Sequence, residues 1–432
     1  MRNLSQMSRV LMLAGLWLGA YALPCRAASF SAATSLSDSN VYPLPARPAL
    51  PGVGKWFSDP TFGTRIMQLT DQTDDDTQTA YSYWPSMNSD STRFWLTIDK
   101  VPPAPMNSIL FDFDPAAETM ARVGNLYTAF AFNPATAIWS WTEPNVIYGV
   151  AGDTTLRKME ITGPATRIYT TLKNMGVGLW QMTMSQDNRF FCWSQLPLGT
   201  SVKVWDRTLD IVYTRDVSSL PFDEAYIDLS GTYVVITAGA NSKLWEFAAG
   251  PTLKDFNSNT AHGSVGYKKH FANSANPNPA LSRWSTWDLT TPALAGVDNM
   301  ANTIYSGIDK HTSWLTPGDM TWAYVGTFKS TLPWTRYQNE IIKVRTDGSG
   351  QWRRLAHTRS DSTFSYRNTP KGNISRDHRW FIYTSDWDTT LKAGQPFHYG
   401  FMLKVPTEAE FAAGNYGSDS IAPAAPRSLR LP

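Results

Sequence analysis

Cysteine is scarce in this sequence, and long apolar stretches are missing from all but its N-terminal end. Only 2 of the 432 residues are cysteine. Cys25 lies in the N-terminal segment discussed below, so Cys192 is the only cysteine left for the folded part and no internal disulfide can form. No later stretch approaches the roughly 18 to 20 uncharged apolar residues that a membrane-spanning helix needs. We therefore expect a soluble chain whose stability comes from a buried core.

An excess of charge of one sign is also lacking. The chain carries 38 lysines and arginines against 36 aspartates and glutamates. A nucleic-acid partner needs a basic surplus on one face, so none is expected. The sequence also lacks a nucleophile elbow, a phosphate-binding loop, an HExxH zinc motif and a Ca²⁺-binding loop motif. These absences remove the support for a hydrolase or a nucleotide-binding protein that depends on such motifs.

The N-terminal end has the pattern of a secretory signal peptide. Arg2 and Arg9 precede an apolar run from Val10 to Ala20, and small residues follow at the two positions that signal peptidase recognises. The apolar run is too short to serve as a permanent membrane anchor. We predict a signal peptide over residues 1–27, and hence a secreted or periplasmic protein without a membrane span.

Proline marks both ends of the expected domain. Residues 28–54 include four prolines between positions 43 and 51. Because proline fixes φ and lacks a backbone donor, this segment should run as an extended linker. Residues 411–432 form a tail rich in proline and alanine. The folded domain is therefore expected over residues 55–410.

Aromatic residues are abundant, and many of them occur in a weak internal repeat. The chain holds 18 Trp, 18 Tyr and 20 Phe. In the repeat, a polar turn of the form Ser-x-Asp is followed within a few residues by an aromatic or β-branched run. The turns are centred on Asp90, Asn145, Asp187, Gly231, Asp319 and Asp377. Most neighbouring turns are about 40 to 60 residues apart, and a weaker copy over residues 262–289 fills the one gap of double length.

Seven copies at this spacing predict an all-β fold, a seven-bladed β-propeller of four-stranded antiparallel blades. Apolar residues recur with a period of two and not 3.6, which excludes helical solenoids. A closed propeller has to protect the edge of its sheets, so we predict that residues 64–71 form the outer strand of the last blade.

The Ser-x-Asp copies, several of them followed by a basic and then an aromatic residue, resemble the repeats of TolB-like and oligogalacturonide lyase β-propellers. The sequence from His311 to Trp314 is similar to the His-x-x-Trp element that contributes a manganese ligand in the oligogalacturonide lyase family. This resemblance implies His311 as a metal ligand and a divalent metal such as Mn²⁺ or Ca²⁺ as the cofactor. The chain departs from the family at residues 371–377, where no histidine precedes the turn.

Two of the six histidines, His262 and His311, lie where an innermost strand should begin. Inner strands line the axis of a propeller, so both rings are expected at its mouth. Chemistry that suits such a site is β-elimination on a uronic acid, which needs a base, an acid and a partner for the carboxylate. We predict His262 as the base, with His311 as a second catalytic residue. The alternative role of both histidines is structural, as a strand cap or as a partner of a backbone group in the next blade.

For the other two tasks the sequence offers pairs of candidates. Tyr267 or Tyr366 would protonate the leaving oxygen, and Arg367 or Lys371 would neutralise the carboxylate. The spacing between His262 and Tyr267 would place them on opposite faces of a regular strand, unless a glycine between them breaks the alternation.

Tryptophans are the other feature that suggests a glycan-binding site, because exposed tryptophan rings stack on sugar rings. The substrate-binding candidates are Trp84, Trp180, Trp314, Lys371 and Asn373. Packing between blades is the alternative for the tryptophans, and a solvated connection is the alternative for the basic loop 366–373.

These residues favour a protein that acts on an extracellular acidic, uronate-containing polysaccharide by β-elimination, in other words a polysaccharide lyase. The alternative is a non-catalytic propeller that binds a glycan or a protein on the same face. The expected partner is a polysaccharide or glycan, and the expected state is a monomer.

Overall fold

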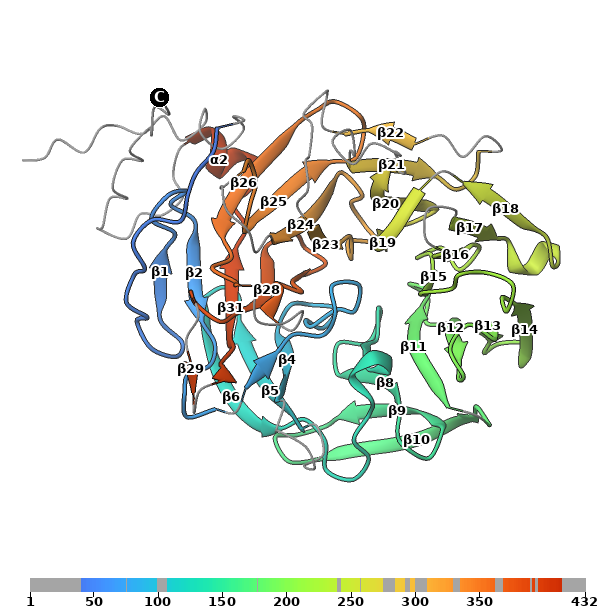
Figure 1. The fold of residues 1–432 in the computed structure, drawn as a ribbon. Helices are drawn as coiled ribbons and strands as arrows, with labels where there is room; N and C mark the ends of the chain where they lie inside the picture. Colours follow the sequence, from blue (N-terminus) through green and yellow to red (C-terminus); the bar gives the residue numbers. More distant parts are fainter. Residues whose placement is uncertain are drawn as a thin grey trace, which may run out of the picture.

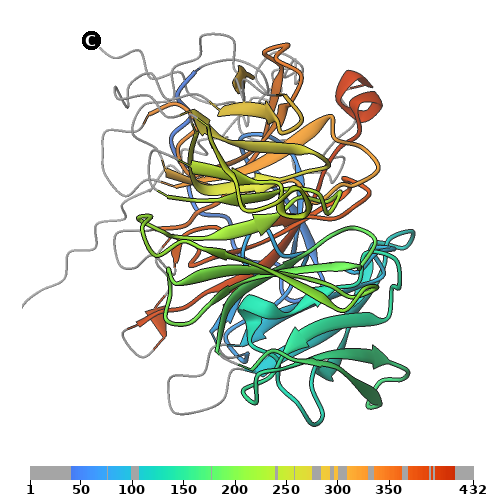
Figure 2. The same ribbon diagram turned by 90° about the vertical axis from the view of Figure 1, so that its right-hand side faces the viewer.

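The computed structural model describes residues 40–413 except 75, 99–106, 177, 239–241, 257, 275–283, 292–295, 300–308, 329–334, 362–367, 389–390 and 393–394. Its strands form seven antiparallel blades arranged in a ring around a central axis (Figure 1). The side view shows the blades nearest the viewer as a stack of sheets (Figure 2). The predicted all-β, seven-bladed propeller is therefore confirmed.

Each of the first six blades is a meander of four strands, from the innermost to the outermost. Blade 1 contains β3 (Thr77–Gln78), β4 (Arg93–Ile98), β5 (Asn107–Asp114) and β6 (Thr119–Asn125). Blade 2 contains β7 (Ile138–Trp139), β8 (Val146–Val150), β9 (Thr155–Ile161) and β10 (Arg167–Asn174). Blade 3 contains β11 (Leu179–Met184), β12 (Phe190–Gln195), β13 (Ser201–Asp206) and β14 (Ile211–Asp216).

The next three blades follow the same order. Blade 4 contains β15 (Ala225–Ile227), β16 (Val234–Ile236), β17 (Ser242–Trp245) and β18 (Leu253–Phe256). Blade 5, which was predicted from the weakest repeat, contains β19 (Ser258–Val265), β20 (Lys269–Ser274), β21 (Trp284–Asp288) and β22 (Gly296–Asp298). Blade 6 contains β23 (Asp309–Ser313), β24 (Trp322–Phe328), β25 (Glu340–Arg345) and β26 (Trp352–His357).

Blade 7 closes the ring with strands from both ends of the chain. It contains β27 (Asn373–Ile374), β28 (Trp380–Ser385), β31 (Tyr399–Lys404), β2 (Arg65–Gln68) and β1 (Trp56–Ser58). Strand β2 pairs antiparallel with β31, with Met67 opposite Met402. The predicted closure by residues 64–71 is confirmed, and β1 adds a fifth strand outside it.

Few other elements accompany the blades in the described part of the chain. They are the hairpin β29 (Leu391–Lys392) and β30 (Gln395–Pro396), the 3-10 turns η1 (Pro134–Thr136) and η2 (Phe247–Ala249), and helix α2 (Glu408–Ala413). In α2, Phe411 is buried, so the packed region continues past the predicted boundary at residue 410. No helix among the described residues is long and apolar enough to cross a membrane.

The repeated turns are held by side chains that bond to the backbone a few residues ahead. The Ser185 hydroxyl accepts a hydrogen bond from the backbone N–H of Phe190 at 3.0 Å, and Ser375 does the same for Trp380 at 3.0 Å. In blade 4, Asp228 takes over this role and accepts from the N–H of Tyr233 at 2.8 Å. Such bonds are local in sequence, which is why the turn recurs as a readable motif.

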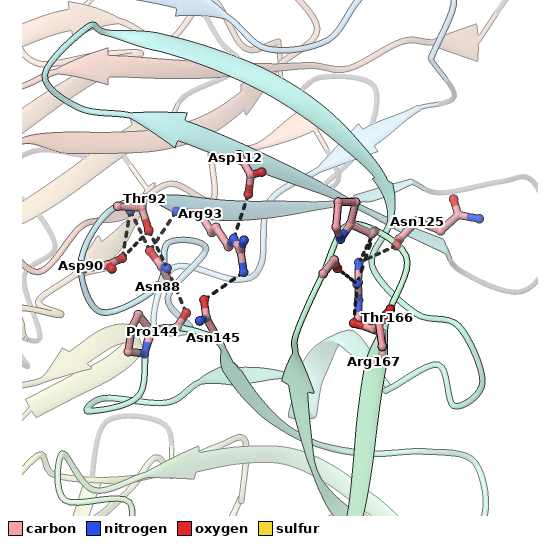
Figure 3. A network of polar contacts seen from close by, with 12 residues as sticks. Asn88, Asp90, Thr92, Arg93, Asp112, Asn125, Pro144, Asn145, Thr166 and Arg167 are labelled. Atoms are coloured by element: carbon pink, nitrogen blue, oxygen red, sulfur yellow. Dashed lines mark hydrogen bonds and ion pairs between the residues drawn. The ribbon is translucent and has the colours of Figure 1, made fainter.

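Polar contacts join blades 1 and 2 at two places (Figure 3). Arg93 donates to Asp112 within blade 1 at 2.8 Å and to the Asn145 side chain of blade 2 at 2.9 Å. Arg167 of blade 2 donates to the backbone carbonyls of Leu126 at 2.8 Å and Asn125 at 3.3 Å. Burial lowers the pKa of Arg167, so these carbonyls compensate a desolvated charge.

Large aromatic side chains fill the space between blades. The largest fully buried side chains include Trp95, Trp139, Trp193, Trp245, Trp284, Trp287 and Trp314. Trp314 packs edge-on against Phe271 of blade 5, with ring centroids 6.2 Å apart. Its ring therefore has no free face for a sugar, and the structure places it in the packing role that the sequence left as the alternative.

Candidate functional site

The inner strands all begin at the same end of the axis, because each blade has four antiparallel strands and the outermost one leads into the next blade. We call this end the mouth. His262 on β19 and His311 on β23 both lie on inner strands of neighbouring blades. Their rings stack with centroids 4.5 Å apart and planes inclined by 28°. The structure thus brings together the two histidines that the sequence singled out.

A break in strand pairing directs His262 to this position. The register between β19 and β20 shifts between Asn259 and Ser264, and His262 adopts a φ of 58°. Such bulges re-aim side chains beside functional sites. The His262 carbonyl accepts a hydrogen bond from the Thr312 hydroxyl at 2.8 Å, which ties the bulge to the strand that carries His311.

Tyr81 of blade 1 lies beside the two histidines, although it is far from both of them in the sequence. Its hydroxyl lies 3.0 Å from Nε2 of His311, and its ring meets the His311 ring edge-on at 5.0 Å. The Lys371 ammonium lies 5.7 Å from the centre of the Tyr81 ring, and the Lys371 carbonyl accepts from the Thr79 hydroxyl at 2.6 Å. We call His262, His311, Tyr81 and Lys371 the mouth cluster.

Burial determines the charge of His311. His311 is 1% exposed, whereas His262 and Tyr81 are half-buried and reach the surface. Desolvation, helped by the neighbouring His262, Lys371 and Lys310, holds the pKa of His311 well below its ordinary value of 6.5. His311 is therefore neutral at pH 7, and its Nε2 can accept a hydrogen bond from the Tyr81 hydroxyl or donate one to it.

The segment that carries Tyr81, residues 79–86, runs along the axis, and we call it the axial segment. Trp84 donates to the carbonyl of Met182 in blade 3 at 2.5 Å. Asn373 of blade 7 accepts from the N–H of Ser86 at 2.9 Å and donates to its hydroxyl at 3.0 Å. Trp84 and Asn373, both predicted to bind substrate, are thus buried residues that hold the axial segment in place.

Beneath the mouth cluster, a buried carboxyl group joins three blades. The hydroxyls of Tyr83 and Tyr226 donate to Glu224, and Gln181 donates to it at 2.7 Å. Burial raises the pKa of Glu224 above its ordinary value of 4.5 despite these donors. This layer separates the polar mouth from the apolar half of the axis.

The opposite half of the axis contains a small apolar cavity. Its lining comes from the ends of several inner strands and from the axial segment. The residues that line it include Trp84, Trp141, Met184, Leu229, Val265 and Leu315. Apart from Ser264, Thr183 and the two tyrosine rings of the Glu224 layer, the lining is apolar, so this end offers little for acid–base chemistry.

The remaining predicted residues lie elsewhere. Tyr267 is 41% exposed in the turn between β19 and β20, at the end of β19 away from the mouth, so it does not join His262. Trp180 is 42% exposed near the mouth end of β11, where its ring can be reached by a ligand. Tyr366 and Arg367 lie outside the described residues.

The mouth cluster does not have the donor set of a metal site. Within the described residues, no group of three or more His, Cys, Asp or Glu side chains is placed to hold a metal ion. The two imidazoles stack, which aims their in-plane lone pairs side by side rather than at one point, and Nε2 of His311 already faces Tyr81. The nearby Lys371 cation further disfavours a dication. The residues present do not fit the Mn²⁺ or Ca²⁺ site implied by the family resemblance.

No known protein family matches the sequence, and no curated protein is significantly similar to it. Solved structures do match the fold. An oligogalacturonate lyase in complex with manganese superposes with a TM-score of 0.60 and 10% identity, covering 84% of this chain and 98% of that one. The oligogalacturonate lyase of Vibrio parahaemolyticus gives a TM-score of 0.55 and 9% identity, covering 83% of this chain and 100% of that one.

The fold defines the class of the protein, the seven-bladed β-propellers of four-stranded antiparallel blades. Within that class, the chain shares the fold of the oligogalacturonate lyases, as the repeat pattern predicted. At 9 to 10% identity the likeness extends to the fold alone.

Proposed function

We propose that this protein is an exported lyase that cleaves an acidic, uronate-containing polysaccharide by β-elimination at the mouth cluster. The observation that carries the proposal is the stacked pair of His262 and His311 with the Tyr81 hydroxyl 3.0 Å from His311. A base, an acid and a cation, the three groups that this reaction needs, meet there. The signal peptide predicted over residues 1–27 supports an extracellular or periplasmic substrate.

Each group of the cluster has one task. The half-buried His262 takes the proton from C5 of the uronate, and the electron pair forms the C4–C5 double bond as the C4–O bond breaks. Tyr81 gives its proton to the departing oxygen, and His311 positions the Tyr81 hydroxyl through Nε2. The Lys371 ammonium neutralises the carboxylate, which makes the C5 proton easier to remove. Tyr81 thus takes the role for which Tyr267 or Tyr366 was predicted.

The test is absorbance near 235 nm, where the unsaturated uronate product absorbs, with purified protein and a panel of polyuronates and sulfated uronate polymers. We expect a rise on at least one polymer, a loss of that rise in His262→Ala, and no loss in Tyr267→Phe. An aliquot treated with EDTA should keep its activity. Loss of activity with EDTA would contradict the metal-free division of tasks.

If the absorbance near 235 nm does not rise with any polymer of the panel, the lyase proposal is rejected. The exposed ring of Trp180 near the mouth would then favour the alternative, a propeller that binds a glycan without cleaving it. A glycan array with the unchanged chain and with Trp180→Ala tests this alternative, because a binding protein should lose signal with the variant.

A further inference from the structure

Residues 40–48, which were predicted to form a linker, lie against the seam between blades 6 and 7, and we call them the strap. The blue N-terminal chain in Figure 1 passes beside β26 before it enters blade 7. Side chains of the seam donate a series of hydrogen bonds to strap carbonyls. These are Arg354 to Asn40 at 2.8 Å, His357 to Tyr42 at 2.9 Å, Arg359 to Pro45 at 3.1 Å and Trp387 to Pro48 at 3.3 Å.

The four donor side chains are buried, and the two arginines among them are also held by carboxylates. Each is between 0 and 3% exposed. Arg354 forms a bidentate ion pair with Glu340, and Arg359 pairs with Asp388 at 2.5 Å. Because these partners set the orientation of each guanidinium, the remaining N–H groups point at the strap without further ordering.

Ring contacts add an apolar anchor to this row of donors. The Arg354 guanidinium lies over the Tyr42 ring at 4.4 Å, and the Tyr42 ring packs edge-on against Phe62 at 5.7 Å. At the other end, Arg47 of the strap donates to the carbonyl of Trp387 at 3.2 Å. The strap is therefore bound along its whole described length.

The chemistry of the seam matches an extended proline-containing peptide. Proline has no backbone N–H, so a proline-rich segment offers mainly carbonyl acceptors and needs a surface of donors and aromatic rings. The seam supplies these, and the strap carries proline at positions 43, 45 and 48. A segment stiffened by proline also loses little conformational entropy on binding.

We propose that the seam of blades 6 and 7 is a binding groove for an extended, proline-containing peptide, which the chain fills with its own residues 40–48. The groove recognises carbonyl oxygens spaced along the peptide, with the Tyr42 ring as the anchor. When the groove is occupied, the strap connects blade 6 to the N-terminal strands of blade 7. This connection adds to the pairing of β2 with β31, which closes the ring. The proposal goes beyond the lyase and does not depend on it.

The test uses the full chain with a protease recognition sequence inserted after the exposed Ala49. Cutting the folded protein there leaves the strap held by the groove alone. We expect native mass spectrometry to show the strap fragment still bound, and an excess of a synthetic peptide of residues 40–49 to exchange with it. A peptide of the same composition in scrambled order should not exchange.

One strap variant, one groove variant and one matched control sharpen the test. Tyr42→Ala and Arg359→Ala should each speed the release of the cut strap by at least about tenfold, since each removes an anchor. Val41→Ala, at a side chain that is 44% exposed, should release at the parental rate. Immediate loss of the strap from the cut parent would overturn the proposed binding groove. Equal rates of strap release from Tyr42→Ala and Val41→Ala would do the same.

Discussion

The two halves of the propeller axis come from the same inner strands but differ in their chemistry. Three inner strands, taken with the residues that flank them, show the change most clearly, from His262 to Val265, from His311 to Leu315 and from Glu224 to Leu229. Each path passes from a polar residue at or near the mouth to an apolar residue at the cavity within three to five positions. The comparison teaches that, in this propeller, position along the inner strand decides whether a residue joins the polar mouth cluster or packs at the apolar cavity.

The largest effect should come from the mouth. We expect His311→Ala to reduce the rate of 235 nm product formation by about 10³-fold, because it removes the ring that both positions Tyr81 and stacks on His262, so the acid and the base are displaced together. Circular dichroism should show an unchanged fold. If the activity of the variant stays within a few-fold of the parent, His311 has no role in the reaction.

A substitution at Leu315, two residues beyond the far end of β23, should give the opposite result. Leu315→Ala removes a side chain that is 3% exposed and borders the cavity, so the free energy of unfolding should fall by about 2–5 kcal/mol. Denaturant titration measures this loss. Turnover well below the unfolding temperature should stay near the parental value, and a large fall in turnover would show that the two halves are not independent.

A smaller effect distinguishes two tyrosines. Tyr81→Phe keeps the ring and removes the hydroxyl 3.0 Å from His311, so turnover should fall by about 10²-fold. Tyr267→Phe, at the exposed turn away from the mouth, should change nothing. Equal activity of the two variants would show that Tyr81 is not the acid.

The smallest effect concerns the layer between the halves, and it depends on pH. Because the pKa of Glu224 is raised on folding, the folded protein binds its proton more tightly than the unfolded chain. Stability from this group is present below the ordinary value of 4.5 and is lost as pH rises through the raised pKa. Glu224→Gln should therefore match the parent near pH 4 and unfold at a higher temperature than the parent at pH 8. A thermal melt at both pH values measures the difference.

The sequence predicted the features that depend on local interactions. The Ser-x-Asp turns are visible because Ser185 and Ser375 bond to backbone groups only five residues away. The histidine pair was predicted because the sequence placed His262 and His311 near the start of two inner strands, and the structure places them within β19 and β23. Closure of the ring by residues 64–71 followed from the need to cover an edge.

Residues whose partners lie far along the chain were missed or misassigned. Tyr81 gave no signal, because it follows the two-residue strand β3 and meets His311 across 230 positions. Asn373 stood in a basic loop and read as a substrate contact, whereas its amide binds Ser86 across 287 positions. Strand alternation alone could not show that Trp314 faces Phe271 of the neighbouring blade.

The axial segment has a consequence for how the propeller unfolds. In a ring of repeats that touch only their neighbours, blades could open one at a time, as in linear repeat arrays. Here one short stretch of blade 1 binds blade 3 through Trp84, blade 4 through Tyr83, blade 6 through Tyr81, and both blade 2 and blade 7 through Ser86. Loss of any of these blades also exposes the axial segment, so partial unfolding is penalised and the domain should melt in a single cooperative transition.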